Sequence, residues 1–516
     1  MHDKTTAAAD SAAITAEPFE RCLDAKLVMA VVATGIMSFS GVCVETAMNV
    51  TFPTLMEEFG VGTSTVQWMT TAYLLVLAAV IPTSSYLNRR FKTKHVFLVA
   101  ICLYIVGILV GFTAQVFPAL LVGRVIEGLG TGIALPLMFN IITEQAPQKS
   151  MGMMMGIGTL VTAMAPAVGP SVGGWLAETF SWRAIFAALL PFLFVSLVLG
   201  LLSIRQSHEV VRDKFDWRGW ALIVCAFGSL VFASVEGGEN GWTSPLTLGL
   251  LALFAIMLAA FVASCRARGR AGEVSLISLS VFANRGFTFS LLAIIALQFC
   301  VLGLSFLIPN YAQLVMGAGE TEAGSILLPG CAVGAVMAPL AGRLLDRFGA
   351  RKPILTGAVC ILAALVLFWA LSKALGTYVA MAIYVLFAFG QSVMVGNSLT
   401  NALSFLPAAT KADGNAVVNT LQQLSGALGT SIASAVVAVS QAAMPNDMAT
   451  ATMLGTRSAY LLLIAVGVLP LVCSLVALAS PKCVEGRDAS EAKAAKAAEA
   501  PHVTRRNGPT AHATAK

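Results

Sequence analysis

Apolar stretches of membrane-crossing length recur along the whole chain, and short polar segments separate them. A helix needs about 20 apolar residues to cross a hydrocarbon core. Because lipid offers no water to backbone N–H and C=O groups, such stretches must be helical. The pattern predicts fourteen membrane-spanning helices, at residues 27–53, 64–87, 95–115, 117–143, 150–176, 183–204, 217–236, 245–265, 286–316, 322–345, 353–372, 376–405, 414–442 and 456–479.

Composition supports an all-α integral membrane protein. Hydrophobic residues make up 57% of the chain and charged residues only 11%, whereas a soluble protein carries about 25% charged residues. The ten cysteines lie mostly inside apolar stretches. Their spacing indicates neither a metal site nor a disulfide framework, so we interpret them as small packing residues. We therefore expect no metal and no cofactor.

The positive charges indicate how the chain is oriented. Most loop Lys and Arg residues follow even-numbered spans, whereas the other loops hold only Arg183, Lys373 and Arg457. The positive-inside rule then places both termini in the cytoplasm of a multi-pass plasma-membrane protein. The net charge of +6 is explained by these flanking residues, so the predicted partner is the lipid bilayer and no nucleic acid. The tails 1–26 and 480–516 are predicted to be cytoplasmic.

An internal repeat predicts how the spans are grouped. Residues 85–94 follow the second span and residues 342–351 follow the tenth, and the two segments look like copies of each other. The repeat predicts two six-helix halves, 27–204 and 286–479. Two helices inserted between them occupy residues 205–285. Two such halves rocking about a midplane site is a known transporter arrangement.

Three charged residues lie deep inside the predicted spans: Glu45, Arg124 and Glu127. A charge at the bilayer centre costs roughly 2.5–3.5 kcal/mol, and such residues are usually functional. Counted from the predicted span ends, Glu45 and Arg124 both lie roughly 10–12 Å below the outer boundary. Our hypothesis is that Glu45 accepts the proton and Arg124 tunes it, so that substrate movement is coupled to proton movement. The alternative is a static ion pair, and Glu127 is either a second protonation site or only a partner of Arg124.

The fifth span has an unusual combination of proline and glycine. Pro166 and Pro170 cannot donate backbone hydrogen bonds and therefore bend a helix. Gly169 and Gly173 lie four residues apart on one face, and small residues at this spacing let membrane helices approach closely. The functional interpretation is a bent helix that shapes the pathway and limits proton leak. Simple tight packing is the other interpretation.

These motifs together resemble the major facilitator superfamily, in its fourteen-span drug:proton antiporter family of the EmrB/QacA type. The resemblance covers nearly all of residues 27–479. The resemblance rests on five segments: the cytoplasmic loop motif Gly342–Arg351, the fourth-span motif Leu121–Gly132, the fifth-span motif Gly156–Gly174, the segment Ser181–Phe186 and the acidic motif Glu45–Asn49. The chain departs from the family pattern at Glu45, where the family usually has Asp, and at Glu127, where it usually has Gln.

The resemblance implies roles for further residues. The antiporter motif would comprise Gly156, Pro166, Gly169, Pro170, Gly173 and Gly174. A cytoplasmic gate would comprise Gly342, Asp346, Arg347, Gly349 and Arg351, although its arginines alone are also explained by the positive-inside rule. Candidates for a substrate cavity are Asn49, Trp68, Tyr73, Met138, Phe139, Asn310, Gln391, Asn397 and Gln422. For most of the polar groups in the second half, the residue types favour hydrogen bonds between helices over a place in the cavity wall.

We therefore predict a proton-coupled antiporter that exports amphipathic drugs or other small molecules across the plasma membrane by alternating access. The substrate class follows from the resemblance, and the predicted partners are this substrate and protons. One alternative is an exporter dedicated to one metabolite or antibiotic, and another class altogether is a membrane-embedded sensor or enzyme. No metal cluster or nucleophile–base arrangement is evident, so we do not expect an enzyme. A partner protein of the outer envelope is left open.

Overall fold

The computed structural model describes residues 24–206, 210, 215–270, 279–407 and 410–480. The predicted tails lie outside this part of the chain, except for residues 24–26 and Ser480. The regular elements in the described part are all helices: α1 (Ala25–Val50), α2 (Phe52–Phe59), α3 (Thr63–Val80), η1 (Ile81–Thr83), α4 (Ser84–Arg90), α5 (Thr93–Thr113), α6 (Phe117–Gln145), α7 (Gln148–Thr179), α8 (Arg183–Ser203), α9 (Trp217–Asn240), α10 (Pro245–Arg270), η2 (Leu279–Ala283), α11 (Arg285–Leu314), α12 (Glu320–Ser325), α13 (Leu328–Phe348), α14 (Arg351–Leu371), α15 (Thr377–Leu403), α16 (Lys411–Ala443) and α17 (Met448–Leu478).

The all-helical membrane fold predicted from the hydropathy pattern is confirmed. Among the described residues, 12 helices are long and apolar enough to cross a membrane. Two long helices, α7 and α13, are not among these 12. They correspond to the predicted spans 150–176 and 322–345.

Some predicted helix boundaries were wrong, and proline explains two of them. The first span was expected to continue to Pro53, but α1 ends at Val50 and Pro53 lies in the first turn of α2. The predicted span 322–345 is divided between α12 and α13, and α13 begins with a proline in its first turn. Proline suits a first turn because the missing N–H would have no helical partner there.

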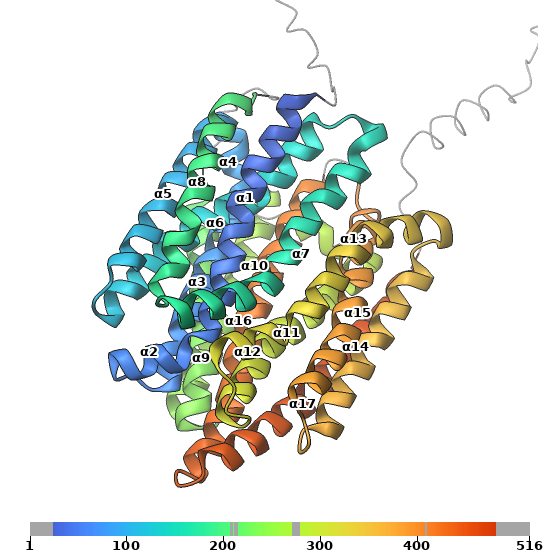
Figure 1. Ribbon diagram of the computed structural model, residues 1–516. Helices are drawn as coiled ribbons and strands as arrows, with labels where there is room; N and C mark the ends of the chain where they lie inside the picture. Colours follow the sequence, from blue (N-terminus) through green and yellow to red (C-terminus); the bar gives the residue numbers. More distant parts are fainter. Residues whose placement is uncertain (1–23, 207–209, 211–214, 271–278, 408–409, 481–516) are drawn as a thin grey trace, which may run out of the picture.

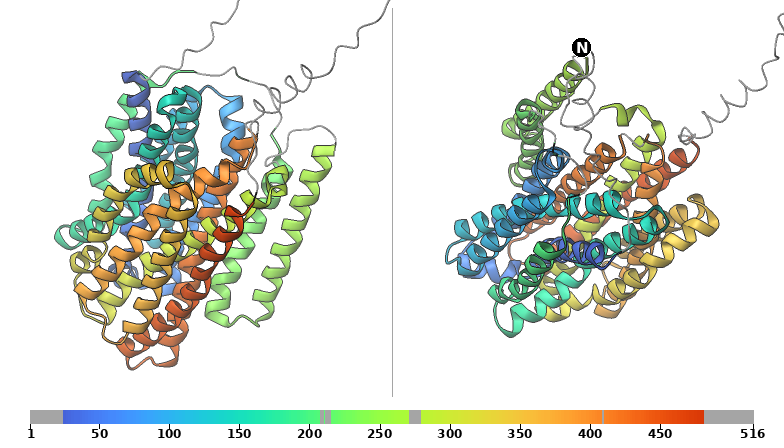
Figure 2. Two further views of the ribbon diagram at one scale, coloured as in Figure 1. Left: turned by 90° about the vertical axis from the view of Figure 1, so that its right-hand side faces the viewer. Right: turned by 90° about the horizontal axis from the view of Figure 1, so that it is seen from above.

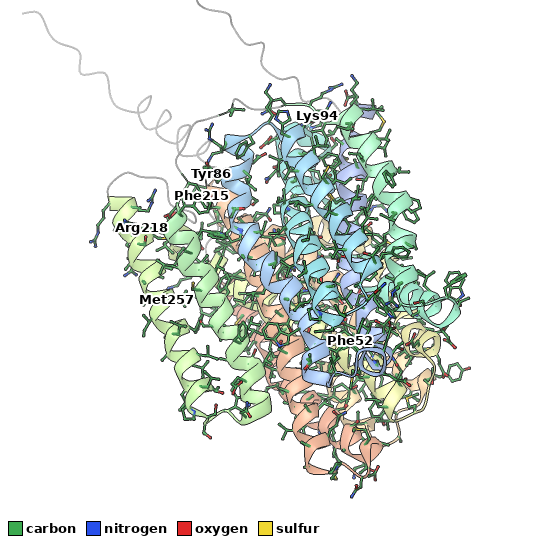
Figure 3. The ribbon with its side chains drawn as sticks, turned by 90° about the vertical axis from the view of Figure 1, so that its left-hand side faces the viewer. Phe52, Tyr86, Lys94, Phe215, Arg218 and Met257 are labelled. Carbon is green, nitrogen blue, oxygen red and sulfur yellow. The ribbon has the colours of Figure 1, made fainter. Side chains whose placement is uncertain are left out.

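The helices form one bundle in which α1–α8 pack mainly on one another and α11–α17 do the same. Contacts between these two groups run mainly through α3 with α16 and through α7 with α12 and α13. We call the two ends of the bundle the tail end, where α1 begins and α17 ends, and the α2 end, where α2 and α12 lie (Figure 1). In Figure 3, Lys94 marks the tail end and Phe52 the α2 end.

The helices α9 and α10 form a pair at the side of the bundle (Figure 2). Helix α9 packs on α3 and α16, whereas α10 packs mainly on α9. An aromatic cluster attaches the pair to α4, because the rings of Tyr86 and Phe215 are 4.8 Å apart (Figure 3). Nearby, the indole N–H of Trp220 donates to the carbonyl of Ala79 at 3.0 Å. The pair is therefore anchored at the seam between the two groups of helices.

Candidate functional site

A buried ion pair lies in the middle of α6. Arg124 Nη1 donates to Glu127 Oε2 at 2.5 Å, and both side chains are 0% exposed. Residues three apart share a helix face, which lets this pair form within one helix. Because burial removes both charges from water, such a pair is costly unless its geometry is good. A merely structural role could be filled by apolar side chains at lower cost.

Neighbouring helices shape this ion pair from two sides. The ring of Tyr73 in α3 lies under the guanidinium of Arg124, with 4.3 Å from the guanidinium carbon to the ring centroid. A cation over an aromatic face is stabilised by the quadrupole of the ring. On the other side, Gly107 of α5 leaves room for Glu127, because a Cβ on this glycine would lie 2.6 Å from Glu127 Cγ. The pair is therefore held between α3 and α5.

Glu45 lies in the same buried region but on α1, and it is only 2% exposed. The charge of Arg124 is within electrostatic range of it. The two residues, both in the described part of the chain, do not form a salt bridge, and Arg124 pairs with Glu127 instead. We expected Glu45 and Arg124 to meet across the interior of the first half. They share the region, but α6 supplies the partner of Arg124.

Several buried polar atoms around this ion pair lack a hydrogen-bond partner among the described residues. Nη2 of Arg124 and Oε1 of Glu127 are two of them. The hydroxyl group of Tyr104, which lies within electrostatic range of Glu127 and Arg124, is another. Nearly all buried polar atoms in folded proteins are hydrogen-bonded, so these polar atoms have hydrogen-bonding capacity that no described protein group uses. Together with Glu45 and Tyr73, these residues form what we name the charged cluster: Glu45, Tyr73, Tyr104, Arg124 and Glu127.

Two glycines predicted to belong to the antiporter motif, Gly169 and Gly173, bring α7 close to α1 next to Glu45. A Cβ on Gly169 would overlap the hydroxyl of Thr46 and lie 2.6 Å from the carbonyl oxygen of Cys43. A Cβ on Gly173 would lie 2.6 Å from that of Ala47. These three neighbours surround Glu45 in sequence, so this close approach helps to keep that acid buried. The surroundings of Gly156 and Pro166 lie outside the described part.

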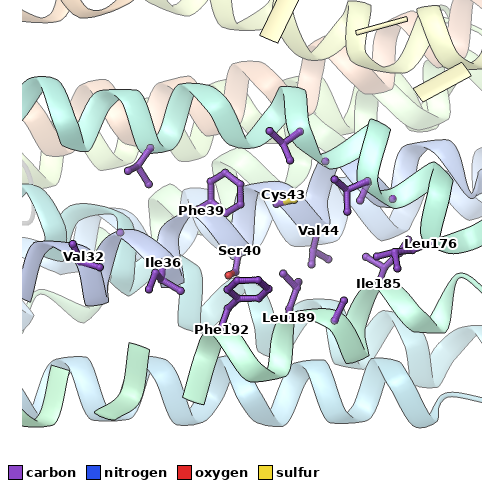
Figure 4. A pocket seen from close by; sticks show the side chains of 18 of the residues that line it. Val32, Ile36, Phe39, Ser40, Cys43, Val44, Leu176, Ile185, Leu189 and Phe192 are labelled. Carbon is purple, nitrogen blue, oxygen red and sulfur yellow. The ribbon is translucent and has the colours of Figure 1, made fainter. Parts of the chain in front are cut away.

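The same face of α7 borders a cavity of about 440 Å³ between α1, α7 and α8 (Figure 4). Its lining is almost entirely apolar and includes Gly169, Gly173 and Phe39. None of the nine residues that we predicted for a substrate cavity lines it. The cavity is suited to an apolar ligand, but it is separate from the predicted set.

The predicted substrate-cavity residues are spread over several surroundings. Tyr73 belongs to the charged cluster, and Trp68 packs on Phe232 of α9 with 4.6 Å between ring centroids. Asn397 Nδ2 donates to the Ala341 carbonyl at 3.2 Å, which joins α15 to α13.

The remaining candidates lie partly or wholly inside the bundle. Asn49 accepts a hydrogen bond from Thr70 at 2.8 Å, and the amide of Asn310 donates to the carbonyl of Phe306 in its own helix. Met138 and Phe139 are buried where α6 approaches α7, whereas Gln391 and Gln422 are half-buried. Hydrogen bonding between or within helices thus accounts for several of these polar side chains.

The predicted gate residues lie at the tail end, where α13 passes into α14. Gly349 ends α13 with a φ of 71°, a conformation that favours glycine. Arg347 and Arg351 are exposed, and Arg347 lies over the ring of Phe348 at 5.4 Å. Gly342 has open space around it. The side chain of Asp346 lies outside the described part of the structure.

At the opposite end, hydrogen bonds join the two groups of helices. Thr54 of α2 donates to Glu320, and the backbone N–H of Thr321 donates to Glu178 of α7 at 2.8 Å. In addition, the hydroxyl of Ser171 donates to the carbonyl of Gly324 at 2.9 Å. We name these three bonds the α2-end clasp. Sequence reasoning missed it, because it joins residues far apart in the chain.

Sequence reasoning also missed that Tyr104 and Gly107 of α5 lie beside the ion pair of α6. Tyr104 is a polar aromatic residue inside the otherwise apolar predicted span 95–115, which was the available signal. Gly107 gives no such signal, since its role depends on the approach of α6.

Comparisons with known proteins identify the family of the chain and agree with its helical fold. Residues 34–430 match the family model of the Major Facilitator Superfamily. The chain is 34% identical over 457 residues to the lincomycin resistance protein LmrB of Listeria innocua. That match covers 86% of this chain and 96% of the relative. It is 28% identical over 418 residues to a multidrug resistance protein B homolog of Mycobacterium tuberculosis, covering 78% and 76%.

Solved structures show the same fold at low sequence identity. A bacterial homolog of the human lysosomal transporter Spinster, in an inward-facing and occupied conformation, matches with a TM-score of 0.61 and 18% identity. That match covers 87% of this chain and 96% of the other. The xylose transporter XylE from E. coli matches with a TM-score of 0.58 and 14% identity, covering 87% and 98%.

Proposed function

The chain belongs to the major facilitator superfamily, and from this premise we propose that it exports amphipathic, drug-like molecules across the plasma membrane in exchange for protons. The family and its solved neighbours are multi-pass membrane transporters rather than enzymes. The export direction and substrate class are supported by relatives named for lincomycin and multidrug resistance. The charged cluster carries the proposal of proton coupling.

The physical argument starts from the charged cluster. Buried ionisable groups in a membrane bundle mark ion or proton pathways by default. Glu45 and Glu127 are both buried within electrostatic range of Arg124, so protonation of either acid changes the net charge of the site. One proton moving through 100 mV supplies about 2.3 kcal/mol. That energy supports a substrate gradient of roughly 50-fold, at about 1.4 kcal/mol per tenfold.

We extend the proposal to fourteen membrane spans, as in the EmrB/QacA type. Helices α7 and α13 support it, since they have 32 and 21 residues and pack along α1 and α15 within the bundle. The division into two six-helix halves, 27–204 and 286–479, is supported by the two groups of mutually packed helices. The inserted segment 205–285 contains α9 and α10.

We also propose cytoplasmic termini. Basic residues such as Arg90, Lys94 and Arg347 lie in the terminal turns of α4, α5 and α13, and Lys94 marks the tail end of the bundle in Figure 3. The positive-inside rule places that end in the cytoplasm. The α2-end clasp then lies at the outer face, where it closes the route between the two halves. Alternating access requires the clasp to open.

The decisive experiment uses purified protein in proteoliposomes with an imposed pH gradient. We expect lincomycin or a lipophilic cation to move against its gradient while protons move the other way. The variant Glu45→Gln should abolish this coupling, whereas the exposed Glu57→Gln serves as the matched control. If no tested compound and no proton moves in the wild type, the proposed function is wrong. Coupled transport that persists in Glu45→Gln would remove the role of Glu45.

An exporter dedicated to one antibiotic is the second candidate, favoured by the name of the Listeria relative. The same vesicles distinguish the two candidates. Transport of chemically unrelated compounds supports the broader function, and transport of lincosamides alone supports the dedicated one.

A further inference from the structure

Two buried carboxyl groups lie within electrostatic range of a single guanidinium in the charged cluster. Glu127 holds Arg124 at 2.5 Å. Glu45 approaches from α1, and Arg124 is the charged residue that acts on it. The other titratable groups that face the cluster, Cys43, Tyr73 and Tyr104, are neutral at ordinary pH. In the described part of α7, Gly169 and Gly173 make the close contacts with the neighbours of Glu45.

Charge balance decides how many protons this site holds. Arginine stays charged in proteins, so Arg124 neutralises one carboxylate but not two. If both acids were ionised, the buried site would carry one uncompensated negative charge. An unpaired buried charge costs several kcal/mol, and such a group takes up a proton instead. One of the two acids therefore carries a proton in this conformation.

The contacts around Arg124 determine which acid that is. The guanidinium is engaged by Glu127, and the ring of Tyr73 lies under it. Gly107 leaves the space that Glu127 occupies. Glu45 forms no salt bridge with Arg124, both residues being in the described part of the chain. The ionised acid is thus Glu127, and the protonated acid is Glu45.

We propose that Glu127 is a positioning residue that holds Arg124 away from Glu45, and that Glu45 consequently carries the exchangeable proton. This inference rests on the proton coupling proposed above and assigns its two acids different roles. When Glu45 releases its proton to water, the carboxylate left behind competes with Glu127 for Arg124. Glu127 thereby sets the pH at which Glu45 exchanges its proton.

The first test compares the pH profiles of transport for two substitutions. Glu127→Gln keeps the shape of the side chain but frees Arg124 to pair with Glu45. We expect the pH of half-maximal substrate-driven proton release to move down by about 1–3 units, the usual displacement of an acid beside an arginine. Glu127→Asp keeps the charge and should leave the midpoint near that of the wild type. A purely structural role predicts slower transport with an unchanged midpoint in both variants, and that result would overturn the proposal.

The second test does not depend on transport. Dicyclohexylcarbodiimide reacts with protonated carboxyl groups in apolar surroundings, and peptide mapping by mass spectrometry identifies the labelled residue. We expect labelling of Glu45 and protection of Glu127 in the wild-type protein at neutral pH. Glu45 labelling should fall by about tenfold or more in Glu127→Gln, because each unit of displacement lowers the protonated fraction about tenfold. Labelling of Glu127 with protection of Glu45 would overturn the assignment, whereas an absence of coupled transport alone would count against the proposed function.

Discussion

The hydroxyl of Ser171 in α7 donates to the carbonyl oxygen of Gly324 in α12 at 2.9 Å, across 153 positions of sequence. The contact is possible because both backbones come very close, and a Cβ on Gly324 would overlap the carbonyl oxygen of Pro170. The segment Gly156–Gly174, which resembles the antiporter motif, therefore contacts the second group of helices as well as α1. It supplies the surface on which α12 rests, and so contributes to the α2-end clasp.

Gly324→Ala should weaken this clasp, because the added methyl group pushes α12 away from Pro170. Overpacking of this kind typically costs about 1–3 kcal/mol. We expect slower disulfide formation between paired cysteines at Thr54 and Glu320, measured with an oxidant in membranes. Gly376→Ala is the matched control, since Gly376 has no neighbour within 4 Å of an added Cβ. Equal cross-linking in both variants would contradict the packing role of Gly324.

The clasp should also respond to pH, because it contains two acids whose pKa values are shifted in opposite directions. Burial, together with neighbouring Glu178, raises the pKa of Glu320, although the hydrogen bond from Thr54 opposes this. Hydrogen bonds from the side chain and backbone of Thr321 lower the pKa of Glu178. The stabilisation from protonated Glu320 is full below its ordinary pKa and is lost as pH rises through the raised value. That from ionised Glu178 is lost as pH falls through the lowered value.

Both contributions coexist between the lowered pKa of Glu178 and the raised pKa of Glu320, so closure should be strongest in that window. Accessibility of a cysteine at position 171 to a membrane-impermeant maleimide measures closure as pH is varied. Glu320→Gln mimics the protonated acid and should remove the loss on the alkaline side. An unchanged alkaline limb in that variant would show that another group controls closure.

Gly169→Ala should displace α7 from α1, because the new Cβ would overlap the hydroxyl of Thr46. We expect a loss of about 1–3 kcal/mol in stability and an exposure of Glu45 that impairs coupling. Thermal unfolding in detergent and the number of protons moved per substrate measure the two effects. Adding Thr46→Ala should restore part of both, whereas Gly228→Ala in open space should change neither. Full activity of Gly169→Ala would contradict the role assigned to this contact.

Trp68 should affect stability more than substrate choice. Its ring packs on Phe232 of α9, and aromatic pairs contribute about 0.5–1.5 kcal/mol beyond their burial. A double-mutant cycle of Trp68→Leu and Phe232→Leu should show a coupling energy of that size by thermal unfolding. The ratio of transport rates across a drug panel should remain constant. If Trp68→Leu selectively abolished the transport of one drug, Trp68 would instead belong to the substrate pathway.

The sequence determined the membrane class and most of the helices, because a long apolar stretch in lipid has no alternative to the helix. It also singled out Glu45, Arg124 and Glu127, because a charge in such a stretch is costly. The predicted helix boundaries near Pro53 and Gly324 were wrong. In both places a short helix, α2 or α12, is separated by a turn from the long helix next to it, and the hydropathy pattern does not reveal that turn.

Only the tertiary structure decided which carboxylate Arg124 engages. Counting residues from the span ends placed Arg124 and Glu45 at similar depth, but depth does not determine the rotation or closeness of helices. Those depend on where glycines such as Gly107 and Gly169 let neighbouring backbones approach. The sequence therefore identified the charges that matter, and helix packing decided that Glu127 holds the arginine while Glu45 lies apart from it.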